Sequence, residues 1–262
     1  MSLAVDGQTV YADSGGRAAD PDLETVLFVH GAGQDHSIWA SPTRYFSRHR
    51  RNVLAVDLPG HGRSGGAPLR SVEEIADWLV AVIDATGLQP TAVAGHSLGS
   101  LAALAAAARH PGRVRAIALV GTALPMTVSA RLLEAARDDR HEAIDMLVRW
   151  GYSDAAREDG TPAPGNPLRE AGQRLLEQAR PGVIYTDLRA CNDYVAGLEH
   201  AAAVRCPALL LLGERDRLTP PRAASQLAAT LPAAETVILE GAGHAMLAEQ
   251  PALVLEHLVR VL

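Results

Sequence analysis

The chain has 262 residues, 48% of them hydrophobic, which favours one large α/β domain with an insertion over two small domains. Its formal net charge is −6 and no block of Lys or Arg stands out, which argues against a nucleic-acid partner. The N-terminus lacks the pattern of a signal peptide, and no segment has the roughly 18 apolar residues of a membrane helix. We therefore expect a cytoplasmic protein with no membrane partner.

The predicted elements begin with an antiparallel hairpin, because β-rich residues flank Asp6-Gly7, a dipeptide that suits a type I′ turn. Strands then alternate with helices, which predicts a mostly parallel sheet covered on both faces. The further predicted strands are 25–30, 52–56, 91–94, 114–120, 208–212 and 236–239. The predicted helices between or after them are 72–86, 98–109 and about 251–262. Ser71 and Glu74 form a capping box at the start of the first helix, and Gly87 ends it.

The alternation breaks between about 123 and 203. This segment holds most of the tyrosines, and we interpret it as a helical cap inserted into a core made of 1–122 and 204–262. Within it the predicted elements are helices over 129–150 and 168–180 and a Pro- and Gly-rich loop over 151–167.

A serine between two glycines, in Gly95-His96-Ser97-Leu98-Gly99, has the pattern of a nucleophile elbow. The string alone is a weak signal, but a predicted buried strand precedes it and a predicted Ala-rich helix follows it. Ser97 is therefore the candidate nucleophile. The side chain of His96, one position earlier in the turn, should point away from that of Ser97 and pack beneath the elbow.

An activated serine needs a base and a third group that orients the base. Asp216 and His244 each follow a predicted strand, and loops at the carboxyl ends of parallel strands converge on one edge of a sheet. The three residues also follow one another along the chain in the order Ser, Asp, His, which is one of the orders known for catalytic triads with a serine nucleophile. Glu214 is the alternative acid, and Asp216 could instead be a turn carboxylate.

The developing oxyanion needs backbone N–H donors. One is expected from Leu98, which follows the candidate nucleophile. The second is expected from Ala32, in the small-residue loop after the strand over 25–30, with Gly33 as the alternative.

These motifs give the chain a resemblance to the α/β-hydrolase-fold serine hydrolases over nearly its whole length. The segments that carry it are His30-Gly31, 57–64, the elbow at Ser97, 213–216 and Gly243-His244. The resemblance implies a mostly parallel eight-stranded sheet flanked by helices, an inserted helical cap, and a structural rather than catalytic role for 57–64. A serine nucleophile argues against haloalkane dehalogenases and epoxide hydrolases, which use aspartate. Gly121-Thr122 offers no carboxylate at the alternative acid position.

We therefore expect hydrolysis of an ester or related acyl bond of a small to medium apolar substrate, without cofactor or metal. A lactonase, a carbon–carbon bond hydrolase and a cofactor-free perhydrolase are alternatives with the same motifs, and a non-catalytic ligand-binding protein is the alternative of another class. Five aromatic residues could line the substrate pocket or pack in the core: Trp39, Trp150, Tyr152, Tyr185 and Tyr194.

The two cysteines, Cys191 and Cys206, have no metal-ligand spacing, and we expect both to be free thiols.

Overall fold

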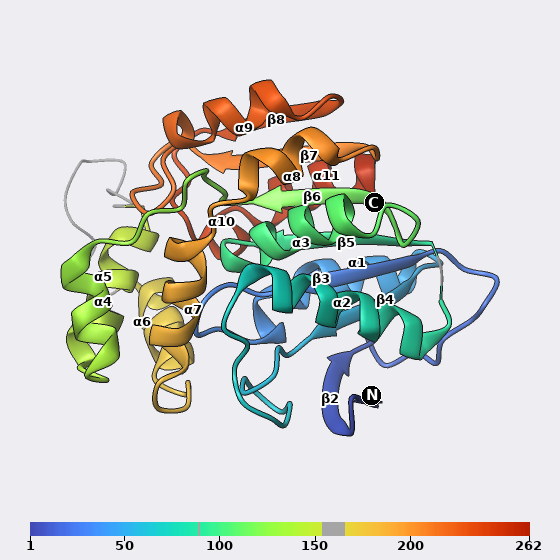
Figure 1. Ribbon diagram of the computed structural model, residues 1–262, viewed down its shortest axis with the longest axis horizontal. Helices are drawn as coiled ribbons and strands as arrows, with labels where there is room; N and C mark the ends of the chain where they lie inside the picture. Colours follow the sequence, from blue (N-terminus) through green and yellow to red (C-terminus); the bar gives the residue numbers. More distant parts are fainter. Residues whose placement is uncertain (89, 154–165) are drawn as a thin grey trace.

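The computed structural model describes residues 1–88, 90–153 and 166–262. An eight-stranded sheet in the order β1-β2-β4-β3-β5-β6-β7-β8 forms its middle layer (Figure 1). The strands are β1 (Ser2–Val5), β2 (Gln8–Asp13), β3 (Thr25–Val29), β4 (Asn52–Val56), β5 (Thr91–His96), β6 (Val114–Val120), β7 (Ala208–Gly213) and β8 (Ala234–Leu239). Strands β3 to β8 pair in parallel, whereas β1 and β2 pair antiparallel. The predicted mostly parallel sheet is confirmed.

The N-terminal hairpin turns at Asp6 and Gly7, whose φ angles of 49° and 74° are both positive. A type I′ turn requires positive φ at both central residues, so the predicted turn chemistry accounts for the pairing of β1 with β2.

Helices cover both faces of the sheet. One apolar cluster joins the sheet to α2, α3, α8 and α9, and a second joins its other face to η1, α1, α10 and α11. The bounds of these elements are η1 (His36–Trp39), α1 (Ala40–Arg48), α2 (Val72–Thr86), α3 (Leu98–Arg109), α8 (Gly197–Ala203), α9 (Ser225–Thr230), α10 (Met246–Glu249) and α11 (Pro251–Val261). A short helix, η2 (Pro221–Ala224), precedes α9. The predicted start of α2 is confirmed, because the Ser71 hydroxyl accepts from the Glu74 N–H at 3.1 Å.

Four further helices lie beyond the carboxyl ends of the parallel strands, and we call them the cap helices (Figure 1). They are α4 (Ala130–Arg137), α5 (His141–Gly151), α6 (Pro167–Leu176) and α7 (Val183–Asp193). The helix predicted over 129–150 is two helices, because Asp139 has a φ of 48° that no α-helix contains. Most of the predicted loop over 151–167 lies outside the described residues. The division into a core and an inserted cap stays a prediction.

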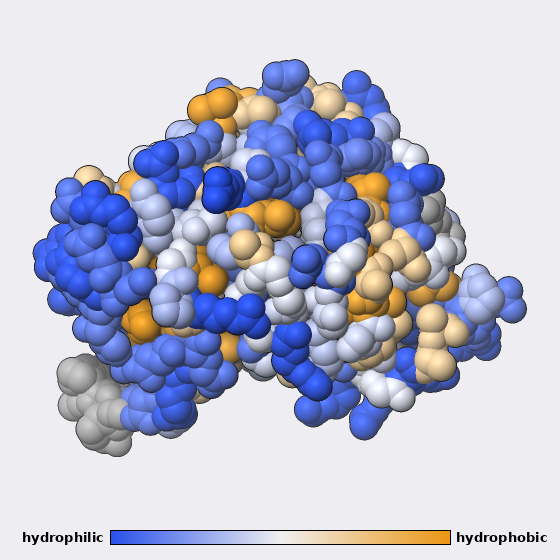
Figure 2. All heavy atoms as spheres, turned by 60° about the horizontal axis from the view of Figure 1, so that its bottom comes forward, coloured by the Kyte–Doolittle hydropathy of each residue, from blue (hydrophilic) through white to orange (hydrophobic). Residues whose placement is uncertain are grey.

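The face of the molecule seen in Figure 2 is mostly polar, with hydrophobic residues scattered over it in small patches. Among the described helices, none is long and apolar enough to cross a bilayer. Cys191 is buried and Cys206 half-buried, and both are free thiols as predicted.

Candidate active site

Ser97 lies where β5 ends and α3 begins, with φ 53° and ψ −117°. A left-handed φ in a serine is strained, and here the crossing of strand and helix enforces it. A Cβ atom added to Gly95 would clash with the Gly99 carbonyl oxygen, and one added to Gly99 would meet the Val29 carbonyl oxygen. Only glycine at both positions permits this turn, which presents the Ser97 side chain at the edge of the sheet.

Asp216 and His244, from the loops after β7 and β8, are in direct contact. The His244 Nδ1–H donates to Asp216 Oδ2 at 2.7 Å, and the Thr219 hydroxyl donates to the same oxygen at 2.6 Å. Burial raises the pKa of Asp216, but the charge and hydrogen bond of His244 and the bonds from Thr219 outweigh it and set the pKa at about 2. The ionised carboxylate keeps the proton on Nδ1, which leaves Nε2 as the basic nitrogen.

The alternative acid, Glu214, is directed elsewhere. Its side chain is exposed and accepts the Gly241 N–H at 2.8 Å, so it braces the loop before His244 and does not contact the His244 ring. The geometry therefore favours Asp216.

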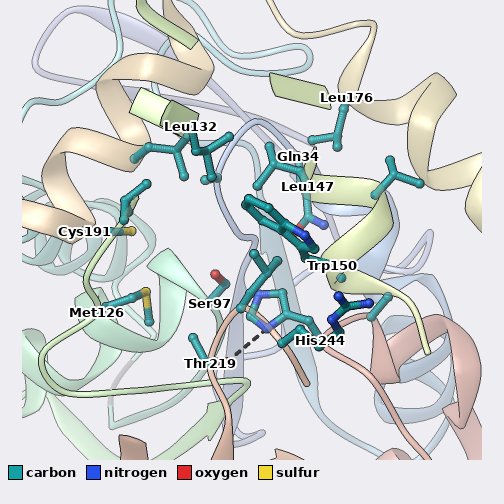
Figure 3. Close-up of a pocket in the computed structure, with 18 of the residues that line it drawn as sticks. Gln34, Ser97, Met126, Leu132, Leu147, Trp150, Leu176, Cys191, Thr219 and His244 are labelled. Carbon is teal, nitrogen blue, oxygen red and sulfur yellow. Dashed lines mark hydrogen bonds between the residues drawn. The ribbon is translucent and has the colours of Figure 1, made fainter. Parts of the chain in front are cut away.

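Ser97 and His244 line one cavity of about 210 Å³ between the sheet edge and the cap helices. Figure 3 shows both side chains directed into it, with Trp150 beside them. Most of the lining is apolar and includes Met126, Leu132, Leu147, Leu176 and Leu188. A mostly apolar cavity with a few polar groups is typical of a small-molecule pocket.

Ala32 and Gly33, the two candidates for the second oxyanion donor, differ in the hydrogen bonds of their N–H groups. Among the described residues, neither the Ala32 N–H nor the Leu98 N–H donates to a protein acceptor, and Ala32 lines the cavity. The Gly33 N–H, in contrast, donates to Asp187 Oδ2 at 2.8 Å. The Gly33 N–H already has an acceptor, so the geometry favours the Ala32 N–H as the second oxyanion donor.

The predicted pocket aromatics divide into two groups. Trp150 and Tyr152 line the cavity. Within the described lining, Trp39, Tyr185 and Tyr194 are absent, so for these three the structure favours the alternative of packing away from the cavity. Trp39 is fully buried and stacks on Phe28 in the core, with ring centroids 4.8 Å apart. The Tyr194 hydroxyl bonds His200 Nδ1 at 2.6 Å, and Tyr185 packs against the cluster of cap helices.

His96 is only 2% exposed, but it also lines the cavity with Ser97 and His244, which the expectation of packing beneath the elbow did not include. Burial lowers its pKa to about 3, so the ring is neutral at physiological pH. Its Nε2–H donates to the His244 carbonyl oxygen at 2.9 Å. His96 therefore supports the backbone of the residue that carries the candidate base.

Three potential metal ligands, Asp35, His36 and Asp57, lie with their ligand atoms within 4.8 Å of one another. Asp57 already accepts from the His36 ring at 2.7 Å and from the Arg63 N–H at 2.8 Å. The first of these bonds joins Asp57, in the loop over 57–64, to the start of η1.

A profile described as "Alpha/beta hydrolase family" matches residues 26–257 of the chain. The chain belongs to this family. A pimeloyl-[acyl-carrier protein] methyl ester esterase of Chromobacterium violaceum is 31% identical over 84% of the chain and 87% of the relative. An (E)-2-((N-methylformamido)methylene)succinate hydrolase of Acinetobacter baylyi is 26% identical over 84% of the chain and 83% of the relative. The enol-lactonase structure from Burkholderia xenovorans LB400 superposes with a TM-score of 0.84 at 22% identity, covering 99% of this chain and 98% of that one.

Several residues of this alpha/beta hydrolase site were not predicted from the sequence. Thr219 bonds Asp216, and Glu249 accepts the N–H groups of Gly243 at 2.5 Å and Ser153 at 2.6 Å, which ties the His244 loop to the end of α5. Asp187, from α7, contacts the loop that holds Ala32. Only Thr219 had a usable signal, since it lies three residues after Asp216 in the same loop.

Proposed function

We propose that the protein is a serine esterase that cleaves esters of small to medium apolar acyl groups through an acyl-enzyme on Ser97. The observation that carries this proposal is the 2.7 Å bond from His244 to Asp216, with His244 and Ser97 lining the same apolar cavity. A serine, an oriented imidazole and a buried carboxylate are the groups that acyl transfer by a serine nucleophile requires.

The proposed reaction has two acyl-transfer steps. His244 Nε2 takes the Ser97 proton as Oγ attacks the ester carbonyl carbon, and the oxyanion receives hydrogen bonds from the Ala32 and Leu98 N–H groups. His244 then gives the proton to the departing alkoxide, and the alcohol leaves. A water molecule, deprotonated by His244, attacks the acyl-enzyme, and His244 returns that proton to Ser97 Oγ as the acid leaves. Asp216 stabilises the imidazolium in each step.

The substrate class is supported by the cavity and by the relatives. A volume of about 210 Å³ with an apolar lining suits a small to medium acyl group. The names of two relatives, a methyl ester esterase and a hydrolase of a succinate derivative, are consistent with hydrolysis at a carbonyl carbon.

A fluorophosphonate probe tests the nucleophile directly. We expect the folded protein to be labelled at Ser97 and to hydrolyse p-nitrophenyl esters, with both properties lost in Ser97→Ala and retained in Ser225→Ala, which removes an exposed hydroxyl. Absence of labelling in the folded wild-type protein would overturn the proposal and favour a ligand-binding protein. Lactones and vinylogous diketones in the same assay distinguish esterase from lactonase and carbon–carbon bond hydrolase.

A further inference from the structure

Cap helix α7 places a carboxylate against the loop of the proposed oxyanion hole. Asp187 is 1% exposed, and its Oδ2 accepts the Gly33 N–H at 2.8 Å, from a residue 154 positions away in the chain. The same oxygen lies 2.8 Å from Nε2 of His61, which is itself buried in the loop over 57–64. One cap side chain thus joins two loops of the sheet edge.

The contacts of His61 favour a charged ring. Nδ1 lies 3.0 Å from the Pro59 carbonyl oxygen and Nε2 lies 2.8 Å from the Asp187 carboxylate, an arrangement that a doubly protonated ring satisfies. Burial lowers the pKa of His61, but the Asp187 charge and hydrogen bond outweigh it, with help from Asp57, and the pKa is raised. His61 and Asp187 therefore form a buried ion pair.

The neighbouring His30, whose ring centroid lies 4.8 Å from that of His61, is neutral rather than charged. Its Nδ1–H donates to the Gly31 carbonyl oxygen at 2.8 Å, while Nε2 accepts the Leu58 N–H at 3.0 Å. Burial and the adjacent His61 charge lower its pKa to about 4. A neutral His30 anchors the loop on one side of Ala32, just as Asp187 anchors it on the other.

The contact between this loop and α7 is close as well as polar. Gly33 has a φ of 67°, and a Cβ atom added there would lie 2.7 Å from Cγ1 of Ile184, on α7. The backbone on the cap side of Ala32 is therefore fixed by α7, through one hydrogen bond and one packing contact. Oxyanion donors stabilise a transition state only when they are held in place before the reaction.

We propose that Asp187 is a positioning residue: paired with His61, it orients the Ala32 N–H toward the oxyanion and makes a competent oxyanion hole depend on the docked cap. This inference rests on the proposed function. Asp187 itself does not line the cavity among the described residues, so it acts through Gly33 and not on the substrate.

The test compares Asp187→Asn with Asp193→Asn, which makes the same chemical change in an exposed ion pair on the same helix. We expect Asp187→Asn to lower kcat by about 10-fold or more, short of the 10²–10³ lost with a whole donor, while KM changes by no more than about twofold. The affinity for a boronic acid that forms a tetrahedral adduct should fall with kcat/KM, whereas the affinity for the product acid should not change. Asp193→Asn should match the wild type in each measurement.

An unchanged kcat in Asp187→Asn, or equal losses for the boronic acid and the product acid, would overturn the proposal. Nitrogen NMR of the wild-type imidazole rings provides a measurement that needs no folded variant: a neutral His61 at neutral pH also overturns it. Fluorophosphonate labelling separates the two proposals. If Ser97 of the wild type is labelled and esters are cleaved while Asp187→Asn is fully active, only this inference fails.

Discussion

Arg217 is the one Asp, Glu, Lys or Arg side chain among the described residues that line the cavity. It follows Asp216 directly and is exposed, so its guanidinium adds a positive charge to a mostly apolar cavity. That charge can distinguish substrates by their remote end.

We therefore expect Arg217→Gln to lower kcat/KM for a p-nitrophenyl ester whose acyl chain ends in a carboxylate, relative to the neutral ester of equal length. An exposed ion pair contributes up to about 1 kcal/mol, so the ratio should fall by about fivefold at most and the difference should shrink in high salt. Arg215→Gln, in the same loop but outside the described lining, is the matched control. Equal ratios in all three proteins would contradict the role of Arg217.

Ser97, Asp216 and His244 could be predicted from the sequence because each lies in a short pattern that fixes its place after a strand. Asp187 could not, because its partners Gly33 and His61 are 154 and 126 residues away and no local pattern encodes the contact. The same limit applies to aromatic residues. Whether a tryptophan lies in a pocket or in the core depends on packing across the sheet, and Trp39 lies in the core.

At the level of elements, the sheet was predictable and the cap was only partly so. A strand buried on both faces is a short β-rich run bounded by turn residues, and β3, β4 and β5 are buried at every position. The cap helices pack on one another in a small cluster of their own, and their limits depend on single residues such as Asp139. Helix α7 was not predicted as a separate element.

The crossing of β5 and α3 gives a prediction about this pair of elements. Gly95→Ala would place a methyl group on the Gly99 carbonyl oxygen, a backbone atom that cannot move without displacing the helix. We expect the free energy of unfolding to fall by more than about 3 kcal/mol, beyond the usual range for overpacking. Gly112→Ala, where an added Cβ meets nothing within 4 Å, should change it by less than about 0.5 kcal/mol. Urea unfolding of the two variants provides the comparison, and similar values would contradict the close crossing.

At the level of the whole molecule, the buried histidines make stability depend on pH in two directions. His30 and His96 are buried and neutral, with pKa values of about 4 and about 3 against 6.5 in a model compound. His61 is buried and charged, with a raised pKa. The first two oppose protonation of the folded state, whereas the third favours it.

The sign of each effect follows from which state binds more protons. Below pH 6.5 the unfolded chain protonates His30 and His96 while the folded protein does not, so each lowers the free energy of unfolding by about 2 kcal/mol at about pH 5. The stabilisation that His61 contributes is fully present below pH 6.5 and is lost as the pH rises through its raised pKa.

The free energy of unfolding should therefore be greatest near pH 6.5 and decline on both sides, as measured by urea unfolding over a pH series. In His96→Gln the acid decline should be shallower by about 2 kcal/mol, whatever the absolute stability of the variant. An acid decline as steep as that of the wild type would show that His96 is charged in the folded protein, contrary to its burial.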